Sequence, residues 1–480
     1  MTQCQSLHSH IVDSPFYGQG YSTREARQVF CAFRRLQRWL EVETALAASQ
    51  AELGIIPAHI HVQLKKTADL GLMDLEAIKA DIANTGHSLI PLLNAWQGVS
   101  DQEAAKYIHF GATTQDIQDT AQSLELREII SILERDLRIV IQELSRLSQE
   151  HSELVIIGRT HGQHALPTTL GLKFAIWLDE MLRNAQRLAE CKKRLLVSQL
   201  FGGVGTMDAF GEKGPQLLDL FSAQLGLAPA ATAWHTSRDR LAEFLSTLAI
   251  ITGTLAKIAN EICQLARDEI GELEEPFHMG KIGSTTMPHK RNPELCEQVV
   301  VLAKLVKSSA SLGFDGLINE HERDYRAVRL EWVTLADASL YTCGAFELMK
   351  NILQKLVVRH DNVGRNLEKS ACLISTEVLM FMLGEKIGKQ KAHQLLYELS
   401  MNSRNNGQAL IDLLLDNQII KENFDSAAIK EAVNPAHHTG SASLLTKRVI
   451  DRAEQWLSEN EVKNDKLRCP LNDNLCGCRG

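Results

Sequence analysis

Long stretches of the chain repeat apolar residues every three or four positions, which is the spacing that places them on one face of an α-helix. Residues 117–150 and 168–199 show this spacing. The clearest stretch is residues 239–270, which contains no proline and has apolar positions at Leu241, Phe244, Leu245, Leu248, Ile251, Leu255, Ile258, Ile262, Leu265 and Ile270. A helix of this length would extend about 45 Å. No alternation with a period of two is convincing, so we expect strands to be minor at most.

A further long helix is expected over residues 22–53. Ser22 and Glu25 have the spacing of a capping box, and apolar residues follow them at helical intervals. Gly54 and Pro57 then supply stop signals. Several long helices with short connections predict an all-α fold built on an elongated bundle. The broad apolar faces of such helices favour a homo-oligomer.

Composition and charge exclude several classes of protein. Apolar residues make up 44% of the 480-residue chain and the formal net charge is −8. A negative net charge argues against a nucleic-acid-binding protein and against attachment to an anionic membrane surface. No apolar run reaches the roughly 18 residues needed to cross a bilayer. The first twenty residues also lack a signal-peptide core, so we expect a cytoplasmic protein.

The ten cysteines indicate reduced thiols, because most stand alone within helical patterns and do not form a disulfide framework. The terminal stretch "CPLNDNLCGC" is different, since it groups Cys469, Cys476 and Cys478. A zinc site there is an alternative, but no second ligand cluster lies nearby and chain ends are usually loose. We therefore predict no metal and no cofactor. The sequence also contains neither a phosphate-binding loop nor a Gly-x-Ser-x-Gly elbow.

Polar, glycine-containing stretches fall between the predicted helices, where chemistry is usually located. In "HFGATTQD" (109–116), Thr113, Thr114 and Gln115 precede a predicted helix. They could bind a carboxylate together with free backbone N–H groups, or they could simply cap that helix. In "GRTHGQHALPTT" (158–169), His161 is a candidate acid or base near neutral pH, with a hydrogen-bonded loop histidine as the alternative.

The stretch "GSTTMPHKRN" gathers cations and hydroxyl groups in one short segment. Lys290 and Asn292 suit a substrate carboxylate. Ser284 and Thr285 stand beside Gly283, where the backbone can bend freely. A hydroxyl group becomes a usable base only where backbone N–H groups stabilise its alkoxide. The alternative interpretation is a basic, solvated turn.

This stretch resembles the signature of the fumarase/aspartase superfamily, and "GATTQD" and "GRTHGQHALPTT" resemble its other two regions, in order. The resemblance spans roughly residues 20–450 and implies an all-α fold in three domains, whose middle domain joins four subunits into one core. The predicted domains are an N-terminal helical domain (1–108), a central bundle of long helices (109–358) and a C-terminal helical domain with a loose tail (359–480). Each active site of the implied homotetramer draws loops from three subunits.

The resemblance also implies a reaction and a set of roles. These enzymes remove a proton from the carbon next to a carboxylate and then expel an amine or oxygen leaving group. His161 matches the general acid, and a hydroxyl in the signature loop, which is expected to act as a lid, is the base. The residues implied to bind the substrate's carboxylates are Thr113, Thr114, Gln115, Lys290 and Asn292. The usual catalytic serine is replaced by Thr285, so Thr285 is the base, or Ser284 takes over, or the base is lost.

Two branches of the superfamily compete. "HFGATTQDIQDTA", "WHTSRDRLAEF" and "RLEW" resemble 3-carboxy-cis,cis-muconate cycloisomerase, which closes a tricarboxylate to a lactone. His87 in "TGHSLIPL" pairs with His161 as in adenylosuccinate lyase, which releases fumarate and AMP. Against the lyase, Gly86 and Ser88 replace the Arg and Asp that usually flank this histidine.

The phosphate-binding segment of the lyase is also altered. "HERDYRAVRLEW" (321–332) places Val328 and Trp332 where the lyase has a serine and an arginine. Arg326 or Arg329 could substitute, and Arg323 and Arg329 are predicted to contact substrate. We expect a cycloisomerase-like enzyme, with adenylosuccinate lyase as the alternative and an inactive helical scaffold as the alternative of another class. The expected partner is a small polycarboxylate or succinylated substrate.

Overall fold

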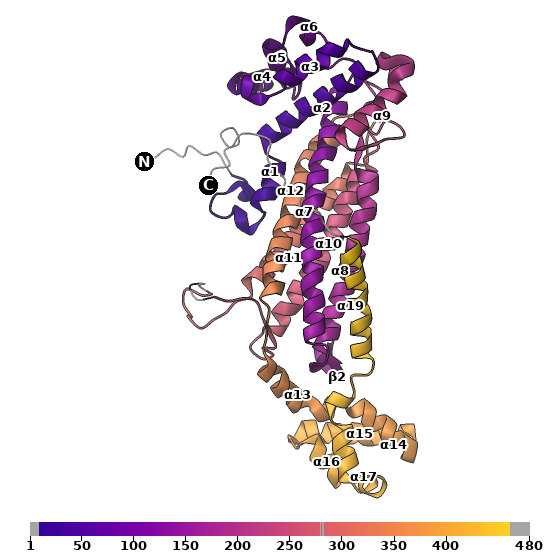
Figure 1. The fold of residues 1–480 in the computed structure, drawn as a ribbon. Helices are drawn as coiled ribbons and strands as arrows, with labels where there is room; N and C mark the ends of the chain where they lie inside the picture. The colour runs from indigo at the N-terminus through magenta and orange to yellow at the C-terminus, as the bar shows by residue number, and fades with distance from the viewer. Residues whose placement is uncertain (1–8, 279, 281–282, 461–480) are drawn as a thin grey trace.

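The molecule is elongated and almost entirely helical, as Figure 1 shows for the computed structural model. The structure describes residues 9–278, 280 and 283–460. Five long helices form the central bundle: α7 (Thr114–Glu150), α8 (Leu170–Leu195), α10 (Asp239–Leu265), α11 (Glu294–Asp315) and α12 (Arg326–Gln354). The predicted all-α fold with a central bundle of long helices is therefore confirmed.

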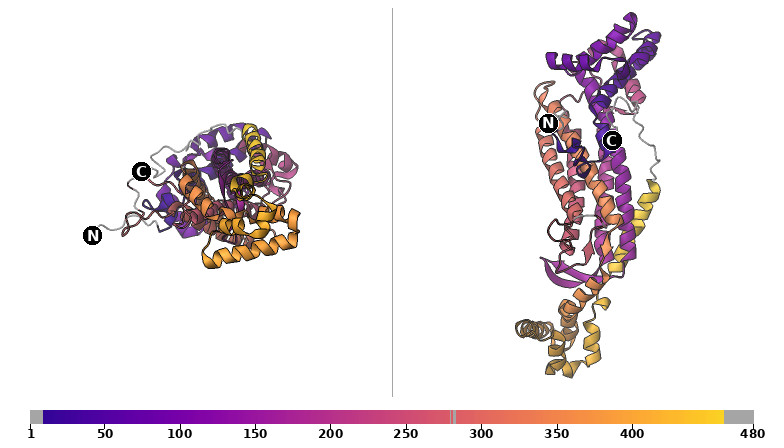
Figure 2. Two further views of the ribbon diagram at one scale, coloured as in Figure 1. Left: turned by 90° about the horizontal axis from the view of Figure 1, so that it is seen from below. Right: turned by 90° about the vertical axis from the view of Figure 1, so that its left-hand side faces the viewer.

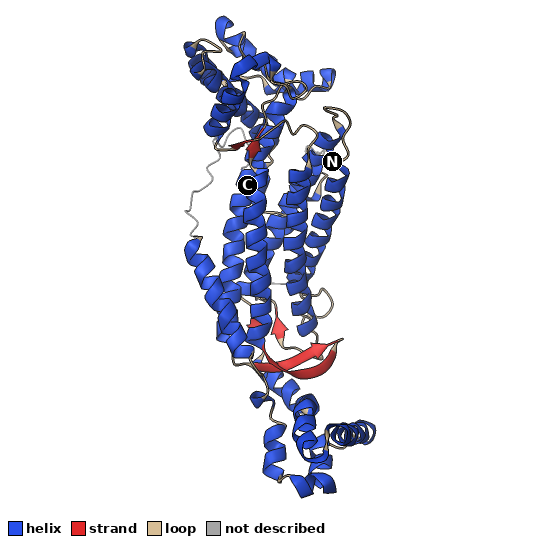
Figure 3. Ribbon diagram, turned by 90° about the vertical axis from the view of Figure 1, so that its right-hand side faces the viewer, coloured by secondary structure: helices blue, strands red, loops and turns tan. Residues whose placement is uncertain are grey.

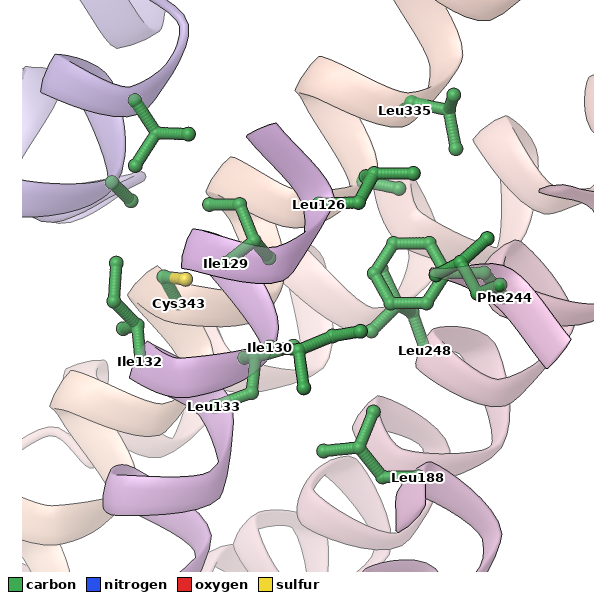
Figure 4. Packing of buried hydrophobic residues seen from close by; sticks show 14 of the residues in the cluster. Leu126, Ile129, Ile130, Ile132, Leu133, Leu188, Phe244, Leu248, Leu335 and Cys343 are labelled. Atoms are coloured by element: carbon green, nitrogen blue, oxygen red, sulfur yellow. The ribbon is translucent and has the colours of Figure 1, made fainter. Parts of the chain in front are cut away.

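The apolar stripes seen in the sequence form the core of this bundle. Figure 4 shows Ile130 and Leu133 of α7 pointing toward Phe244 and Leu248 of α10, with Leu188 of α8 beside them. All five side chains are at most 1% exposed. Burying an aliphatic or aromatic side chain of this size contributes about 1.5–3 kcal/mol relative to leaving it in water. Packing of these faces, more than intrinsic helix propensity, holds the long helices in place.

The most apolar helix is α10, which by length and composition could cross a membrane, with a mean hydropathy of 1.5 over its most apolar window. More than half of that window is buried inside the protein. The helix packs against α8, α11 and α12. Its apolar face is therefore explained by the bundle core.

Further helices gather at both ends of the bundle, as the right-hand view of Figure 2 shows. The N-terminal group is α1 (Arg24–Val29), α2 (Ala32–Glu52), α3 (Ala58–Thr67), α4 (Leu75–Thr85), α5 (Ile90–Val99) and α6 (Gln102–Ala105), and α9 (Gly214–Leu225) packs against α2. The C-terminal group is α13 (His360–Ile374), α14 (Thr376–Ile387), α15 (Lys389–Asn406), α16 (Leu410–Asp416), α17 (Gln418–Asn423) and α18 (Ser426–Ala432). Helices α14 to α18 enclose a separate small core.

The last helix, α19 (Ala442–Glu459), leaves the C-terminal group and returns to the bundle. It packs along α7 and α8. Arg138 of α7 donates to the carbonyl oxygens of Leu457 (2.6 Å) and Asn460 (2.9 Å). The three domain boundaries expected from the sequence stay a prediction.

The strands are short, and Figure 3 shows their positions in red. They are β1 (Val155–Thr160), β2 (Gln163–Thr169), β3 (Val197–Ser198), β4 (Ala228–Pro229), β5 (Leu273–Glu274) and β6 (Val357–Val358). Strands β1 and β2 form an antiparallel hairpin, so the stretch 158–169 is not a simple loop between helices. His161 (φ 55°) and Gly162 (φ 74°) make its two-residue turn, and positive φ at both positions is typical of a type I′ hairpin turn.

The predicted single helix over residues 22–53 is wrong in detail, because it is divided into α1 and α2. Phe30 and Cys31 leave the helical conformation, and Cys31 has a ψ of 131°. The N-cap is Thr23 and not Ser22: the Thr23 hydroxyl accepts a hydrogen bond from the N–H of Ala26 at 3.2 Å. The helices predicted over 168–199 and 239–270 also end earlier, as α8 and α10.

Candidate active site

A cavity of about 320 Å³ lies where the N-terminal helices meet the beginning of α7. It is lined by Gly86, His87, Ser88, Thr113, Thr114, Gln115, Gln118, Arg323 and Tyr325. These residues come from the α4–α5 connection, from the start of α7 and from the segment before α12. Five of the residues predicted from the sequence are therefore brought together: His87, Thr113, Thr114, Gln115 and Arg323.

The start of α7 supplies backbone donors and Arg323 supplies a charge. Thr113 is the N-cap residue, and its backbone N–H donates to Asp116 Oδ2 at 3.1 Å to complete a capping box. Arg323 Nη1 donates to Thr113 Oγ1 at 2.7 Å. The guanidinium therefore lies over the positive end of a 37-residue helix. This combination favours binding of an anion such as a carboxylate.

Asp116 fixes this helix end and is fully buried. Its carboxylate accepts the backbone N–H groups of Phe201 (3.0 Å) and Gly202 (2.9 Å), and it lies 3.0 Å from His235 Nε2. The capping that was the alternative interpretation of "TTQD" is thus present, and Thr113 and Thr114 also line the cavity.

Beneath the cavity, a buried ion-pair network joins three helices. Arg238, before α10, donates to Asp119 of α7 (2.8 and 3.0 Å) and to Glu331 of α12 (Nε to Oε1, 2.8 Å). Burial alone lowers the pKa of Arg238, but the two carboxylates more than offset this and raise the pKa above its usual range. Sequence reasoning missed this network, because its members stand far apart in the chain and belong to no motif.

His87 caps α5 and faces the cavity. Its Nδ1 accepts the backbone N–H groups of Leu89 (3.2 Å) and Ile90 (3.1 Å). The proton of the neutral imidazole is therefore on Nε2, since Nδ1 is an acceptor. In this tautomer His87 can donate a hydrogen bond from Nε2 into the site.

A second histidine, His109, supports the segment leading to Thr113. Sequence reasoning missed this residue. His109 Nδ1 lies 2.6 Å from Glu43 Oε1, and His109 has a φ of 59° that side chains rarely adopt. Burial alone lowers the pKa of His109, but the hydrogen bond and charge of Glu43 outweigh burial and raise the pKa. The next carbonyl, of Phe110, accepts from Gln50 Nε2 at 2.7 Å. In the sequence, the one signal that could have identified His109 is its position within "HFGATTQD".

His161 lies at the opposite end of the bundle, because the β1–β2 hairpin follows the end of α7 (Figure 3). At 1.5 Å per residue, the 37 residues of α7 separate its two ends by about 55 Å. The hairpin is anchored by Arg159, which makes two hydrogen bonds to Glu272 at 2.7 and 2.9 Å. His161 itself is exposed at the turn.

The predicted signature loop, residues 283–292, lies beside the bundle at the end where α11 begins (Figure 1). Ser284 Oγ accepts the backbone N–H groups of Thr286 (3.2 Å) and Met287 (3.0 Å). Thr285 and Lys290 are exposed. Within the described part of the chain, the Thr285 hydroxyl makes no hydrogen bond.

Asn292 closes this loop by donating from Nδ2 to the carbonyl oxygen of Gly283 at 2.7 Å. A Cβ at position 283 would lie 2.2 Å from the carbonyl oxygen of Lys290, so only glycine fits there. The signature glycine and asparagine therefore hold the two ends of the loop together. None of the loop's predicted site residues lines the cavity at the start of α7.

The arginines after "HERD" have local partners. Arg329 stacks on the ring of Tyr325, with its guanidinium carbon 4.9 Å from the ring centroid. Arg326 Nη2 lies 2.7 Å from Asp324 Oδ2. Val328 is buried, and Trp332 packs against a second tryptophan, Trp39. Val328 is thus part of the core, and the half-buried Trp332 packs against the core.

The described ranges contain no group of three or more His, Cys, Asp or Glu residues placed to hold a metal ion. Cys469, Cys476 and Cys478, for which a zinc site was the alternative, lie outside the described residues.

Comparison with known proteins places this geometry in a family. A family model described as "Lyase" matches residues 20–307, and one described as "Adenylosuccinate lyase C-terminus" matches residues 372–449. The chain is 39% identical to an N-acetyl-S-(2-succino)cysteine lyase of Dickeya dadantii, over 93% of this chain and 98% of the relative. It is 38% identical to an adenylosuccinate lyase of Methanothermobacter thermautotrophicus, over 91% of this chain and 98% of the relative.

Solved structures give the same result. A 3-carboxy-cis,cis-muconate lactonizing enzyme from Pseudomonas putida superimposes with a TM-score of 0.86 and 32% identity, covering 92% of this chain and all of the other. A fumarate lyase from Mesorhizobium superimposes with a TM-score of 0.85 and 31% identity, over 91% of this chain and all of the other. The chain belongs to the fumarase/aspartase superfamily of lyases and cycloisomerases, in the branch that contains adenylosuccinate lyase and 3-carboxy-cis,cis-muconate cycloisomerase.

Proposed function

We propose that the protein releases fumarate from a small S-succinylated thiol such as N-acetyl-S-(2-succino)cysteine. The observation that carries this proposal is the lining of the cavity at the start of α7: one arginine, Arg323, and otherwise uncharged polar or aromatic groups and glycine. Such a wall suits a thiol portion with a single carboxylate and neutral polar atoms. Two relatives named for this activity, from Dickeya dadantii and Enterococcus italicus, are 39% and 38% identical to the chain.

The proposed elimination needs a base, an acid and groups that hold carboxylates. The base removes a proton from the succinyl carbon next to a carboxylate, and the electron pair forms the double bond of fumarate. The carbon–sulfur bond breaks, and sulfur leaves with the bonding pair and is protonated by the acid. Lys290 and Asn292 stabilise the charge that develops on the carboxylate, as preorganised donors do in other sites. His161 is the proposed acid, and His87 is its proposed partner in proton transfer.

Two adjacent hydroxyl groups remain candidates for the base. Thr285 occupies the place of the usual catalytic serine. Ser284 is the residue whose oxygen accepts two backbone N–H groups, and hydrogen bonds of this kind favour the deprotonated form of a group. We assign the base to Ser284 or Thr285, to be separated by substitution.

A complete site requires more than one copy of the chain. Arg323 and Thr113 lie at one end of α7, whereas the His161 hairpin follows its other end, about 55 Å away by the rise of the helix. A substrate of a few ångströms cannot touch both groups in one chain. This separation supports a homotetramer in which neighbouring subunits complete each site.

The geometry disfavours adenylosuccinate as the substrate. Its phosphate would need cations in addition to Arg323, but Val328 is buried, the half-buried Trp332 packs against Trp39, and Arg329 lies against Tyr325. The cycloisomerase expected from the sequence stays the second candidate, because the lactonizing enzyme from Pseudomonas putida superimposes over 92% of the chain. Because the chain belongs to a family of enzymes, we favour an active enzyme over an inactive helical scaffold.

The proposal is tested by incubating the purified protein separately with N-acetyl-S-(2-succino)cysteine, adenylosuccinate and 3-carboxymuconate. We expect equal amounts of fumarate and free thiol from the thioether, and loss of both in the Lys290→Ala variant. Lactone formation from the tricarboxylate without any thiol release would instead favour the cycloisomerase. Fumarate from adenylosuccinate alone would favour the purine-pathway lyase.

A further inference from the structure

Two cysteines lie opposite each other where α10 ends and α11 begins. Cys263 is two residues before the end of α10, and Cys296 is two residues after the start of α11. The helices pack together, and a Cβ at Gly313 of α11 would lie 2.4 Å from Leu245 Cδ1 of α10. Counting from Leu245 to Cys263 and from Gly313 back to Cys296 gives 18 and 17 residues. The helices are therefore antiparallel, and the two cysteines are at the same level of the bundle.

The two thiols are in contact but differ in their surroundings. Their side chains form a hydrogen bond with each other. Cys263 is half-buried, whereas Cys296 is fully buried. The hydrogen bond from Cys296 lowers the pKa of Cys263 against the opposing effect of burial, and the same bond together with burial raises the pKa of Cys296. Oxidation favours a thiol that is accessible and readily forms a thiolate, so an oxidant reacts first with Cys263.

Cys296 is also connected to the signature loop. Its backbone N–H donates to Glu275 Oε2 at 3.0 Å, and the N–H of Leu295 donates to Oε1 at 3.2 Å, which caps the first turn of α11. Asn292, which closes the loop, stands only four residues earlier. The sulfur atoms of a disulfide are about 2.05 Å apart, much closer than two hydrogen-bonded thiols. A disulfide would therefore pull the first turn of α11 toward α10 and shift Asn292 and Lys290.

We propose that Cys263 and Cys296 form a reversible disulfide when the protein is oxidised, and that this bond lowers catalytic activity by displacing the signature loop. The disulfide does not depend on the function proposed above, whereas its measurement through fumarate release does. Cys263 is the thiol that reacts with the oxidant, and Cys296 is the thiol that resolves the product.

The reaction with hydrogen peroxide as the oxidant is balanced by two molecules of water. The Cys263 thiolate attacks one peroxide oxygen, the O–O bond breaks, and the departing hydroxide takes up the thiol proton to become water. This leaves a sulfenic acid on Cys263. The Cys296 sulfur then attacks the Cys263 sulfur, the S–O bond breaks, and the hydroxyl group leaves with the Cys296 proton as the second water. The two sulfurs lose two electrons to the peroxide, and a small thiol reverses the change by exchange.

The test treats the purified wild-type protein with hydrogen peroxide, blocks the remaining thiols with iodoacetamide and digests the product with trypsin. We expect peptides 258–267 and 292–304, each with one cysteine, to be joined by a bond that dithiothreitol cleaves. Release of fumarate from N-acetyl-S-(2-succino)cysteine should fall about 10-fold or more, because a displacement of about 1 Å can have a larger effect. Dithiothreitol should restore it. Absence of the joined peptides would overturn the site, and full activity of the joined form would overturn its effect on the loop.

Three variants separate the roles of the thiols. Cys263→Ser should stay active in peroxide, whereas Cys296→Ala should stop at the sulfenic acid on Cys263, which dimedone traps. Cys372→Ser is the matched control, because Cys372 is also half-buried but burial raises its pKa to about 12. This control should stay as sensitive to peroxide as the wild type. Equal loss of activity in Cys263→Ser and the wild type would overturn the proposal.

A second measurement keeps the loop testable without turnover. If none of the candidate substrates is converted, the proposed function has failed, but the joined peptides still decide the disulfide. The rate at which trypsin cleaves the folded protein after the exposed residues Lys290 and Arg291 then reports on the loop. We expect this rate to differ between the oxidised and the reduced protein, and equal rates would show that the disulfide leaves the loop in place.

Discussion

Ser284 and Thr285 are adjacent hydroxyl side chains with different surroundings, and this difference leads to a test of the base. Ser284 accepts two backbone N–H groups, whereas Thr285 is exposed. If Ser284 is the base, Ser284→Ala should lower kcat by roughly 10²–10⁴ and Thr285→Ala should lower it much less. The measurement is steady-state fumarate release by both variants. The reverse order of effects would assign the base to Thr285.

The pair formed by His109 and Glu43 predicts a pH-dependent stability. The pKa of His109 is raised in the folded protein above the usual value of about 6.5. Its stabilising contribution is therefore complete below pH ~6.5 and is lost as the pH rises through the raised pKa. Glu43→Gln removes this contribution, which for a hydrogen bond to a charged group is about 1.5–3 kcal/mol.

The check is the free energy of unfolding in urea at a series of pH values. The difference between wild type and Glu43→Gln should be largest at acidic pH and shrink above pH ~6.5. A difference that stays constant across this range would show that the pair does not titrate there. His59→Gln, at an exposed histidine 3.4 Å from Glu103, is a control with little expected effect.

At the scale of elements, the signature loop depends on the close approach at Gly283. A Cβ there would lie 2.2 Å from the carbonyl oxygen of Lys290, which is backbone and cannot turn aside. We expect Gly283→Ala to displace Ser284 and to lower kcat/KM at least 10-fold. Circular dichroism should show an unchanged helix content, because the loop lies outside the bundle. Full activity in Gly283→Ala would show that this closed form of the loop is not needed.

The long helices could be predicted from the sequence and the hairpin could not. In α10 the apolar side chains follow one helical period over 27 residues, so chance matches are excluded. The hairpin has strands of six and seven residues with mixed burial, and its register shifts near Gly158. Its turn contains His161 at positive φ, a position where sequence patterns would place Gly or Asn.

The residues of the candidate site also differ in whether the sequence alone could identify them. Thr113, Thr114 and Arg323 could be selected from motifs, because each stands in a short stretch of recognisable composition. Ser88 and Gln118, which also line the cavity, could not, since only a 2.6 Å contact between segments 30 residues apart brings them together. The Arg238 network could not be predicted for the same reason, because its partners are more than 90 residues away in the chain.

At the scale of the whole molecule, the separation of the site residues predicts complementation between inactive variants. Arg323→Ala removes a group at one end of the bundle and Lys290→Ala removes a group at the other. Mixed tetramers of the two variants should recover part of the wild-type activity, because some sites contain both intact groups. Refolding the variants together and assaying fumarate release measures this.

Sedimentation of the same samples should show a tetramer. Refolding each variant alone is the control and should give no activity. Complementation would be contradicted if the mixture stayed inactive although mixed tetramers had formed. A stable, active monomer would overturn the shared site altogether.

The return of α19 to the bundle has a consequence for the order in which the chain matures. Ala453 and Trp456 of α19 pack on the core formed by α7 and α8, which are synthesised about 300 residues earlier. On the ribosome, that part of the earlier helices therefore stays uncovered until α19 emerges. Contacts between such distant segments also slow folding, since a long chain must close before they form. Premature termination before residue 442 would leave a nearly full-length product with an open apolar seam, suited to capture by a chaperone or to aggregation.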